Sequence, residues 1–421
     1  MRKTLPIIAF LLSVALQVCA QQKNYDFQEG KLFYKITDAT KQYVQVTTEL
    51  DELLEATGTL YNSPIKGDVA IPANVNYQGK QYTVTGIGDN AFGGCTQVTS
   101  VSMPASITSL GEQVFLSCTG LKRITVDSNN TVLKDVDGVL FDKSGNKLIA
   151  YPNMRATNYD IPEGTVELGA ASFFMCNEIK NINFPPTLKK IGMLAFGICS
   201  KMNEVTIPET VTDLGDFAFY NCTGLEKAII KANISELKRY MFSRCTALKE
   251  VSLPSTIEFI RTWAFGSCAA MKNIKLPDNL KGIEAEAFNG CETLSEITLP
   301  ASLEQIGMYT FDGCKQLKCI TCLRDTPLKG AAMGAGVFEN VDKIACELKV
   351  PKGHRNEYAE AEQWGDFTRI SEHDLSGIGT IISQDSNTQT TIFTINGQRL
   401  PNNTQPSHGI YIINGKKVCV K

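Results

Sequence analysis

Cysteine is the residue type here with the widest chemical range, because a thiol can form a disulfide, bind a metal or act as a nucleophile. The 421-residue chain contains 14 cysteines. From Cys176 to Cys314 one cysteine recurs every 23 residues, and a single longer gap of 58 residues separates Cys118 from Cys176. Nine cysteines follow a phenylalanine by three residues, in the pairs Phe92/Cys95, Phe115/Cys118, Phe173/Cys176, Phe196/Cys199, Phe219/Cys222, Phe242/Cys245, Phe265/Cys268, Phe288/Cys291 and Phe311/Cys314.

This spacing predicts that the nine thiols are buried rather than reactive. A residue that returns once per 23-residue unit occupies one fixed position of a repeated structure, and cysteine in such a position serves as a small buried hydrophobe. Parallel side chains that face the same way fit disulfide geometry poorly. We therefore expect a ladder of buried thiols, with regular disulfides as the alternative.

The pair Cys319 and Cys322 is spaced like half of a zinc site or like a redox pair. In the repeat register Cys322 falls on an inward position and Cys319 on an outward one, so the two side chains should not converge on a metal. Cys346 and Cys419 lie outside the ladder and are left unassigned.

The repeats lack the residues for nucleophilic catalysis. The three histidines are His354, His373 and His408, all beyond the repeats, so a Ser-His-Asp or Cys-His arrangement has no histidine there. Carboxylates such as Glu204 and Glu250 recur at exposed repeat positions and indicate a solvated face rather than a catalytic pair. We expect no catalytic residue, no metal site and no cofactor.

Composition narrows the class of protein. A hydrophobic share of 43% and a charged share of 20% are typical of an ordered globular chain. The length exceeds what one compact core usually reaches, so several domains or a repeat array is expected. A net charge of −3 and a pI near 5.8 give no basic surface for nucleic acid.

The positions between the cysteines repeat as well. Apolar residues stand three, six and eight residues after each cysteine and a proline usually stands nine after it, as in Leu294, Ile297, Leu299 and Pro300. The alternation predicts a short strand that proline ends. Pro162 keeps this phase, so the long gap should hide a degenerate repeat. The period predicts a repeat solenoid of parallel strands, one coil per 23 residues.

The motif Ile-Pro-x-x-Leu-x-x-Ile-Gly-x-x-Ala-Phe-x-x-Cys-x-x-Leu, seen almost complete in 299–317, resembles the BspA-like leucine-rich repeat. The resemblance implies a leucine-rich repeat solenoid over about 68–350 with a hairpin insertion near 128–158. It also implies an N-terminal β cap at 21–67 and a C-terminal cap at 351–374. Two departures are Lys231 in place of a proline and Val341 in place of a tenth cysteine.

The N-terminus is typical of a secretory signal peptide over residues 1–20. Arg2 and Lys3 precede an apolar run from Leu5 to Val18, and cleavage is expected after Ala20. Lipidation at Cys19 is the alternative. No transmembrane span is expected in the mature chain.

The C-terminus changes composition. Residues 375–390 read as a linker, and 391–421 predict a β-hairpin tail because Asn396-Gly397 and Asn414-Gly415 follow short apolar runs. The tail resembles a short C-terminal sorting domain of type IX secretion, and a small structural module is the alternative. Either reading implies the envelope or exterior of a Gram-negative bacterium.

Function is expected on the outward strand positions, which in a leucine-rich array build the concave face. These candidate partner-binding residues are Arg123, Thr125, Asn181, Asn183, Glu204, Thr206, Lys227, Ile229, Glu250, Ser252, Asn273, Lys275, Glu296 and Thr298. They are polar, mixed in charge and without an aromatic anchor.

The resemblance implies a non-enzymatic secreted or cell-surface adhesion protein that binds host extracellular-matrix proteins or bacterial surface proteins or glycans. A structural envelope scaffold without a specific ligand is the alternative. A carboxylate-based hydrolase is a third and weaker hypothesis.

Overall fold

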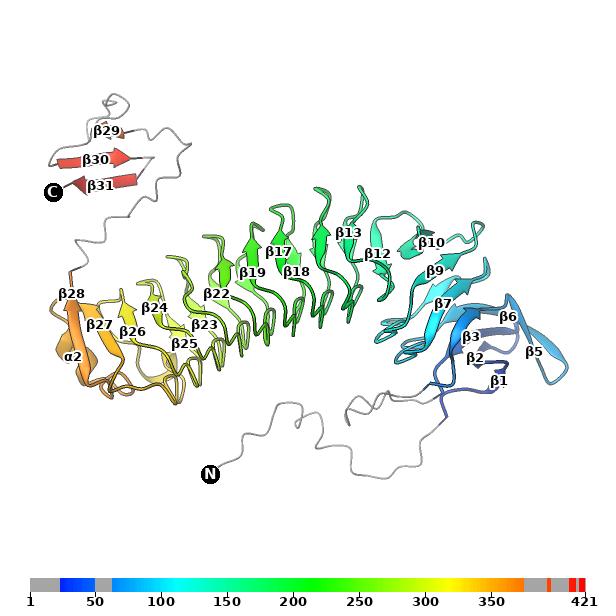
Figure 1. The fold of residues 1–421 in the computed structure, drawn as a ribbon, viewed down its shortest axis with the longest axis horizontal. Coiled ribbons are helices and arrows are strands. Elements are labelled where there is room, and N and C mark those ends of the chain that lie inside the picture. Colours follow the sequence, from blue (N-terminus) through cyan, green and yellow to red (C-terminus); the bar gives the residue numbers. More distant parts are fainter. Residues whose placement is uncertain (1–22, 50–62, 375–391, 395–408, 414–415, 421) are drawn as a thin grey trace.

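The chain folds as a curved row of stacked coils (Figure 1). The computed structural model describes residues 23–49 and 63–374, and the backbone of 392–394, 409–413 and 416–420. The predicted signal peptide, Cys19 and the predicted linker lie outside the described residues. Strand pairing advances by one repeat per coil, since Glu204 pairs with Lys227 and Lys227 with Glu250. The solenoid predicted from the spacing is confirmed.

Each regular coil begins with what we call its first strand, five to eight residues after the cysteine. Along these strands the predicted alternation is seen, because Val205 and Ile207 are buried whereas Glu204 and Thr206 are exposed. The first strands are β4 (Gly67–Ala70), β7 (Val98–Met103), β9 (Arg123–Val126), β13 (Asn158–Asp160), β15 (Asn181–Asn183), β17 (Glu204–Ile207), β19 (Lys227–Ile230), β21 (Glu250–Ser252), β24 (Glu296–Leu299), β26 (Cys319–Cys322), β27 (Glu347–Pro351) and β28 (Arg369–His373).

A second, shorter strand follows the turn of most coils, and these strands form a separate layer with parallel pairing. Most second strands have only two residues, one of them buried, as with Leu214 and Leu237. The second strands are β8 (Ser109–Leu110), β12 (Lys147–Ala150), β14 (Glu167–Leu168), β16 (Lys190–Ile191), β18 (Asp213–Leu214), β20 (Glu236–Leu237), β22 (Phe259–Ile260), β23 (Gly282–Ile283) and β25 (Gln305–Ile306).

The N-terminal end of the row is covered by a mixed sheet in the order β1-β2-β3-β6-β5, in which β8 also pairs with β6. Phe33, Tyr34 and Val46 of this sheet are buried against the first coils. Its strands are β1 (Phe27–Glu29), β2 (Leu32–Asp38), β3 (Tyr43–Thr47), β5 (Asn74–Tyr77) and β6 (Lys80–Ile87).

The phenylalanines of the Phe-x-x-Cys motif form buried stacks, one of Phe92 with Phe115 and a longer one that runs on from Phe173. The rings of Phe196 and Phe219 are 5.2 Å apart and nearly parallel, and those of Phe219 and Phe242 are 5.5 Å apart. Tyr151 takes this place in the degenerate repeat, with its ring 4.8 Å from that of Phe173. Since the strand β13 also pairs with β15 one repeat apart, the hidden repeat is confirmed.

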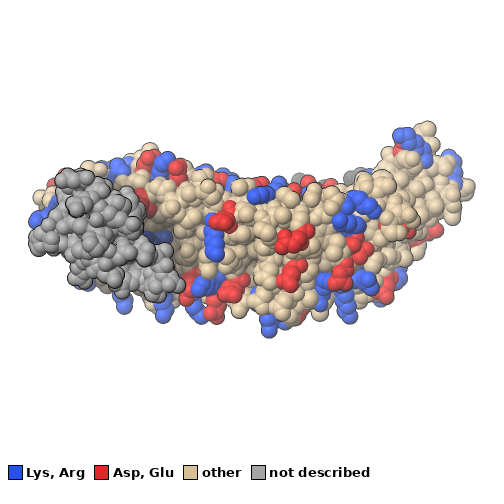
Figure 2. Space-filling model, turned by 90° about the horizontal axis from the view of Figure 1, so that it is seen from above, with Lys and Arg blue, Asp and Glu red and all other residues tan. Residues whose placement is uncertain are grey.

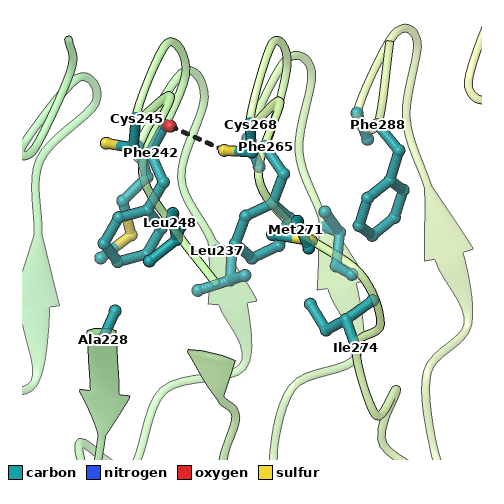
Figure 3. Packing of buried hydrophobic residues seen from close by; sticks show 14 of the residues in the cluster. Ala228, Leu237, Phe242, Cys245, Leu248, Phe265, Cys268, Met271, Ile274 and Phe288 are labelled. Atoms are coloured by element: carbon teal, nitrogen blue, oxygen red, sulfur yellow. Dashed lines mark hydrogen bonds between the residues drawn. The ribbon is translucent and has the colours of Figure 1, made fainter. Parts of the chain in front are cut away.

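The cysteines lie beside this stack as free, buried thiols. Seven of the nine donate to the carbonyl oxygen of a phenylalanine one coil back. Cys245 Sγ donates to Phe219 O at 3.2 Å, and Cys268 Sγ donates to Phe242 O at 3.2 Å, the bond drawn in Figure 3. This bond explains a cysteine at the position, because the thiol is small and apolar and still carries a weak donor.

The segment that carries Phe-x-x-Cys, which we call the Phe–Cys turn, is bonded to the next coil by three amides. Phe217, Phe219 and Asn221 donate their N–H groups to carbonyl oxygens one coil on, at 2.9, 3.0 and 2.8 Å. Phe217 and Asn221 have positive φ values of 61° and 55°. Such angles are strained for a bulky residue, and the inter-coil bonds hold them in place.

One coil carries an insertion. The hairpin of β10 (Leu133–Val136) and β11 (Val139–Asp142) extends the second-strand layer on the side of β12 that faces the preceding coils, where Figure 1 shows β10 between β9 and β12. The buried core divides here into two clusters, with Leu140 in one cluster and Phe141 in the other. The hairpin therefore acts as a wedge in the stack, and we call it the hairpin wedge.

The C-terminal end is closed by a short 3₁₀ turn (Gly330–Ala332), by the helix α2 (Arg355–Ala359) and by the buried Tyr358 and Trp364. The tail forms an antiparallel sheet of β29 (Ile392–Thr394), β30 (Gly409–Ile413) and β31 (Lys416–Val420). Asn396-Gly397 and Asn414-Gly415 lie outside the described residues, so the predicted hairpin tail stays a prediction.

Candidate functional site

The outward side chains of the first strands, with the equivalent positions of the strandless stretch at 271–277, form the surface that we call the strand face. It contains the fourteen residues predicted from the sequence, and the structure leaves none of them buried. Eleven are exposed, and Thr125, Lys227 and Ile229 are half-buried. The repeat register therefore placed the outward side chains correctly, while their role in binding stays a prediction.

Side chains of equivalent repeat positions contact one another along the strand face. Asn181 Nδ2 donates to Asn158 Oδ1 at 2.7 Å, and Asn183 Nδ2 donates to Asp160 Oδ1 at 2.6 Å. Farther along, Lys227 Nζ lies 3.1 Å from a carboxylate oxygen of Glu250. These ladders hold neighbouring side chains in fixed relative positions.

The strand ladder is interrupted between β15 and β17, which belong to different sheets. Pro185 and Pro186 follow β15 closely, and proline cannot donate to a ladder. A polar cleft of about 290 Å³ lies at this break. Its lining residues are Asn181, Ile182, Asn183, Phe184, Glu204, Thr206 and Pro208.

Four of the predicted binding residues thus meet in one cleft, which we call the asparagine cleft. Phe184 adds an apolar wall that the sequence did not single out, and its ring contacts Phe196 edge-on at 5.9 Å. The other predicted residues lie outside this cleft. Asn273 and Lys275 belong to no strand, because the ladder is interrupted again at 271–277.

Aromatic side chains gather instead on the Phe–Cys turns, two residues before the buried phenylalanine. The rings of Phe217 and Tyr240 are 4.5 Å apart and those of Tyr240 and Trp263 are 6.0 Å apart, each pair within 5° of parallel. All three are half-buried. Sequence reasoning missed this row, although aligning the repeats on Phe-x-x-Cys places the three residues at one position.

The thiols of the ladder are not poised for chemistry. Burial raises the pKa of Cys95 to about 11 and that of Cys291 to about 12, and it raises the pKa of Cys118 and Cys268 well above the ordinary value. A protonated thiol is a poor nucleophile and a poor metal ligand.

The remaining chemical candidates stay apart. Cys322 is buried and Cys319 is half-buried, as their register predicted. Within the described residues no group of three or more His, Cys, Asp or Glu side chains is arranged to hold a metal ion. Helices of the described part of the chain are also too short and too polar to cross a membrane.

The charged groups of the molecule are dispersed. Figure 2 shows basic and acidic side chains interspersed over the visible face, without a large patch of one sign. A compact ionic group lies on the second-strand layer, where Arg261 bonds to Glu236 and Glu284. Burial acts to raise the pKa of Glu284, but hydrogen bonds from Arg261 and Thr262 outweigh it and the pKa is lowered.

The repeat matches a known family model. The model of the BspA type leucine-rich repeat region matches six copies, over residues 73–146, 147–272 and 260–356. The chain belongs to the BspA-type leucine-rich repeat family. The resemblance read from residues 299–317 is thereby confirmed, and no curated protein matches the chain.

Solved structures of bacterial leucine-rich repeat proteins are similar to this BspA-type chain. A leucine-rich repeat protein from Eubacterium ventriosum is 23% identical, covers 68% of this chain and 93% of its own, and has a TM-score of 0.52. A leucine rich cell surface protein from Faecalibacterium prausnitzii is 20% identical, covers 82% of this chain and 98% of its own, and has a TM-score of 0.44. The first of these likenesses shows a shared fold.

Proposed function

We propose that this BspA-type protein is a non-enzymatic, secreted or cell-surface binding protein whose strand face recognises a protein or glycan. The observation that carries the proposal is the asparagine cleft, where Asn181, Asn183, Glu204 and Thr206 converge on a rigid ladder beside Phe184. A pocket that combines fixed polar groups with one apolar wall is the usual form of a recognition site.

The hydrogen-bonding groups of the cleft suit an uncharged polar partner. Asn181 and Asn183 each donate one N–H to the preceding strand, which fixes the amide and leaves its carbonyl oxygen as an acceptor. No ion pair to Glu204 is found among the described residues, so its carboxylate can also accept. Sugar hydroxyls and peptide amides both supply the matching donors.

Three further features belong to the proposal. The family resemblance supports a matrix protein, or a protein or glycan of another bacterium, as the partner. The sequence of residues 1–20 supports export, and the tail at 391–421 supports sorting to the outer surface of a Gram-negative bacterium. The mixed, exposed carboxylates of the strand face support binding rather than hydrolysis.

The test is binding of residues 21–421 to arrays of matrix proteins and glycans. The strand-face variant carries Glu204→Lys, Glu250→Lys and Glu296→Lys together, and we expect it to lose at least about ten-fold in affinity for the ligand found. Asn183→Ala, which changes no charge, should lower the affinity for the same ligand by a few-fold.

The matched control reverses three carboxylates on the proline turns, with Glu163→Lys, Glu209→Lys and Asp278→Lys, all of them exposed. It makes the same change of net charge and should bind as wild type does. Unchanged binding by the strand-face variant would sink the proposal. Absence of any ligand on either array would favour the structural scaffold instead.

A further inference from the structure

The hairpin wedge leaves one Phe–Cys turn without a neighbouring coil. The wedge adds two strands to the second-strand layer and, at the usual spacing of strands, lengthens this layer by about 10 Å. The turn of residues 111–118 therefore faces a cleft instead of another coil. We call it the seam cleft, and its volume is about 310 Å³.

The backbone of this turn has an open hydrogen-bonding edge. In the preceding coil Asn90, Phe92 and Gly94 donate to carbonyls of the next coil at 3.0, 3.0 and 2.8 Å. In residues 111–118 the equivalent donors belong to Gln113, Phe115 and Ser117, and none of these amides has a protein partner among the described residues. Gln113 and Phe115 line the cleft.

Side chains that line the seam cleft also lack contacts that equivalent residues make in the regular coils. The ring of Phe115 stacks on Phe92 at 5.5 Å, and no ring covers its other face among the described residues. Across the cleft, Ser172 is 2% exposed, and its hydroxyl has no hydrogen-bond partner in the described structure. An unpaired buried hydroxyl is costly, so both walls lack contacts that the regular coils make.

We propose that the seam cleft binds a short segment of a partner polypeptide. The segment's backbone carbonyls accept from the amides of Gln113, Phe115 and Ser117, in the place that the next coil's carbonyls hold elsewhere. An apolar side chain of the segment covers Phe115, and a polar group of the segment pairs with the Ser172 hydroxyl. Addition of a chain to an open backbone edge is a common mode of peptide recognition.

Other occupants fit this cleft less well. An anion would need a net positive wall, but Lys147 pairs with Glu167 at 3.0 Å and Glu112 lies on the opposite side. A glycan lacks the regular row of carbonyl acceptors that would match three open amides on alternate residues. Donors on alternate residues match the carbonyl spacing of a polypeptide.

The experiment selects peptides from a phage-displayed library of random dodecamers on the full chain and measures the synthetic peptides by fluorescence anisotropy. The blocking variant is Ala171→Tyr. Ala171 lines the cleft with a φ of 53°, and Tyr240 occupies the same repeat position with a φ of 55°, so the fold accepts tyrosine there. The variant should bind selected peptides at least about ten-fold more weakly.

The matched control is Leu194→Tyr, which introduces tyrosine at the same repeat position one coil later, where the φ is 56° and the side chain does not line the cleft. It should bind the peptides within two-fold of wild type. The second readout is amide exchange. Saturating peptide should slow exchange of Gln113, Phe115 and Ser117 at least about ten-fold, and leave Asn90 and Phe92 unchanged because they are already bonded.

Three results would overturn the proposal. They are a selection that enriches no peptide, enriched peptides that bind Ala171→Tyr as tightly as wild type, and peptide binding without slower exchange at the three amides. Sedimentation without peptide tests a second copy as occupant. A dimer that Ala171→Tyr dissolves would also overturn the partner-peptide assignment.

Discussion

The regular array, from Phe173 to Cys314, and the seam at Phe115 use the same repeat with different outcomes. In the array Phe219 has a ring on both faces, and its turn donates three amides to the next coil. At the seam Phe115 has a ring on one face, and the three amides are open. In the array, each coil thus supplies the carbonyl acceptors and ring contacts that its neighbour needs. The break at the seam leaves three amides and one ring face without these partners, and they are free to contact another molecule.

The largest expected difference in stability between the array and the N-terminal core appears at alkaline pH. Burial raises the pKa of six ladder thiols in the array, and of Cys95 and Cys118 in the N-terminal core. The six are Cys176, Cys199, Cys245, Cys268, Cys291 and Cys314. Folded thiols stay protonated above pH 9 whereas unfolded ones ionise, so their stabilisation is complete below pH 9 and is lost as pH rises.

The free energy of unfolding should fall by about 1 kcal/mol per thiol for each pH unit above 9. The array, with three times as many such thiols, should lose stability about three times as steeply as the N-terminal core. Urea unfolding in reductant, read by pulsed hydrogen exchange and mass spectrometry, measures each region. Cys199→Ala with Cys268→Ala should flatten the array's slope, and equal slopes for the two regions would contradict the prediction.

Removal of a stacked ring tests the same comparison at neutral pH. Phe219→Ala opens a cavity between two rings and should cost about 5 kcal/mol, whereas Phe115→Ala removes a ring with one stacked neighbour and should cost about 3 kcal/mol. Urea unfolding of the two variants gives the difference. Phe→Leu at each position serves as the control, and a larger loss at Phe115 than at Phe219 would show that the seam is packed as tightly as the array.

The array could be predicted from the sequence because every coil carries the same 23-residue motif as its neighbours. The 23-residue period and the alternation at Ile297 and Leu299 fixed the coil, the first strand and the buried side of each cysteine. The second strands escaped prediction, since a pair such as Lys190–Ile191 is too short to show alternation. Their position depends on the coil above and below rather than on local pattern.

The two clefts escaped prediction for a different reason. The outward residues of the asparagine cleft were predicted, but the ladder break at Pro185 that brings them together is a matter of pairing between coils. The seam cleft arises from where the hairpin of β10 and β11 is placed in space, which the length of the insertion does not give. The sequence shows where the repeat is broken, but it does not predict how the chain is arranged in space at the break.

A smaller effect is expected for Asn130, which ties the hairpin wedge to the preceding coil. Its side chain is 1% exposed, donates to the carbonyls of Pro104 and Ile107 at 3.2 and 2.9 Å, and accepts from two amides of the hairpin. Asn130→Ala leaves these groups unpaired and should cost about 2 kcal/mol. Urea unfolding measures the loss, and exchange of residues 104–118 should quicken.

The array offers a comparable hydroxyl for this prediction. Ser302 Oγ donates to the carbonyls of Asp278 and Leu280, both at 2.8 Å, but it is only half-buried. Ser302→Ala should cost about 1 kcal/mol or less, because water can replace the lost bond. A loss at Ser302 equal to that at Asn130 would mean that the wedge is no more dependent on one residue than a regular coil is.

The smallest effect is expected on the strand face itself. Glu250 pairs with Lys227 at 3.1 Å, but its side chain is 69% exposed, so Glu250→Gln should change the free energy of unfolding by less than about 0.5 kcal/mol. Glu284 makes better-shielded bonds, to Arg261 and to the amide and hydroxyl of Thr262. Glu284→Gln should therefore cost about 1 kcal/mol or more at neutral pH.

The contrast between these two carboxylates bears directly on function. The pKa of Glu284 is lowered in the folded state, so its contribution is present at neutral pH and is lost as pH falls below about 4.5. The destabilisation caused by Glu284→Gln should therefore be smaller at pH 4 than at pH 7, which urea unfolding at the two pH values measures. Where removal of a charge does not change the free energy of unfolding, the residue can change to suit a binding partner without loss of the fold. Equal losses for both variants would make the strand-face charges structural and would remove that support for a binding role.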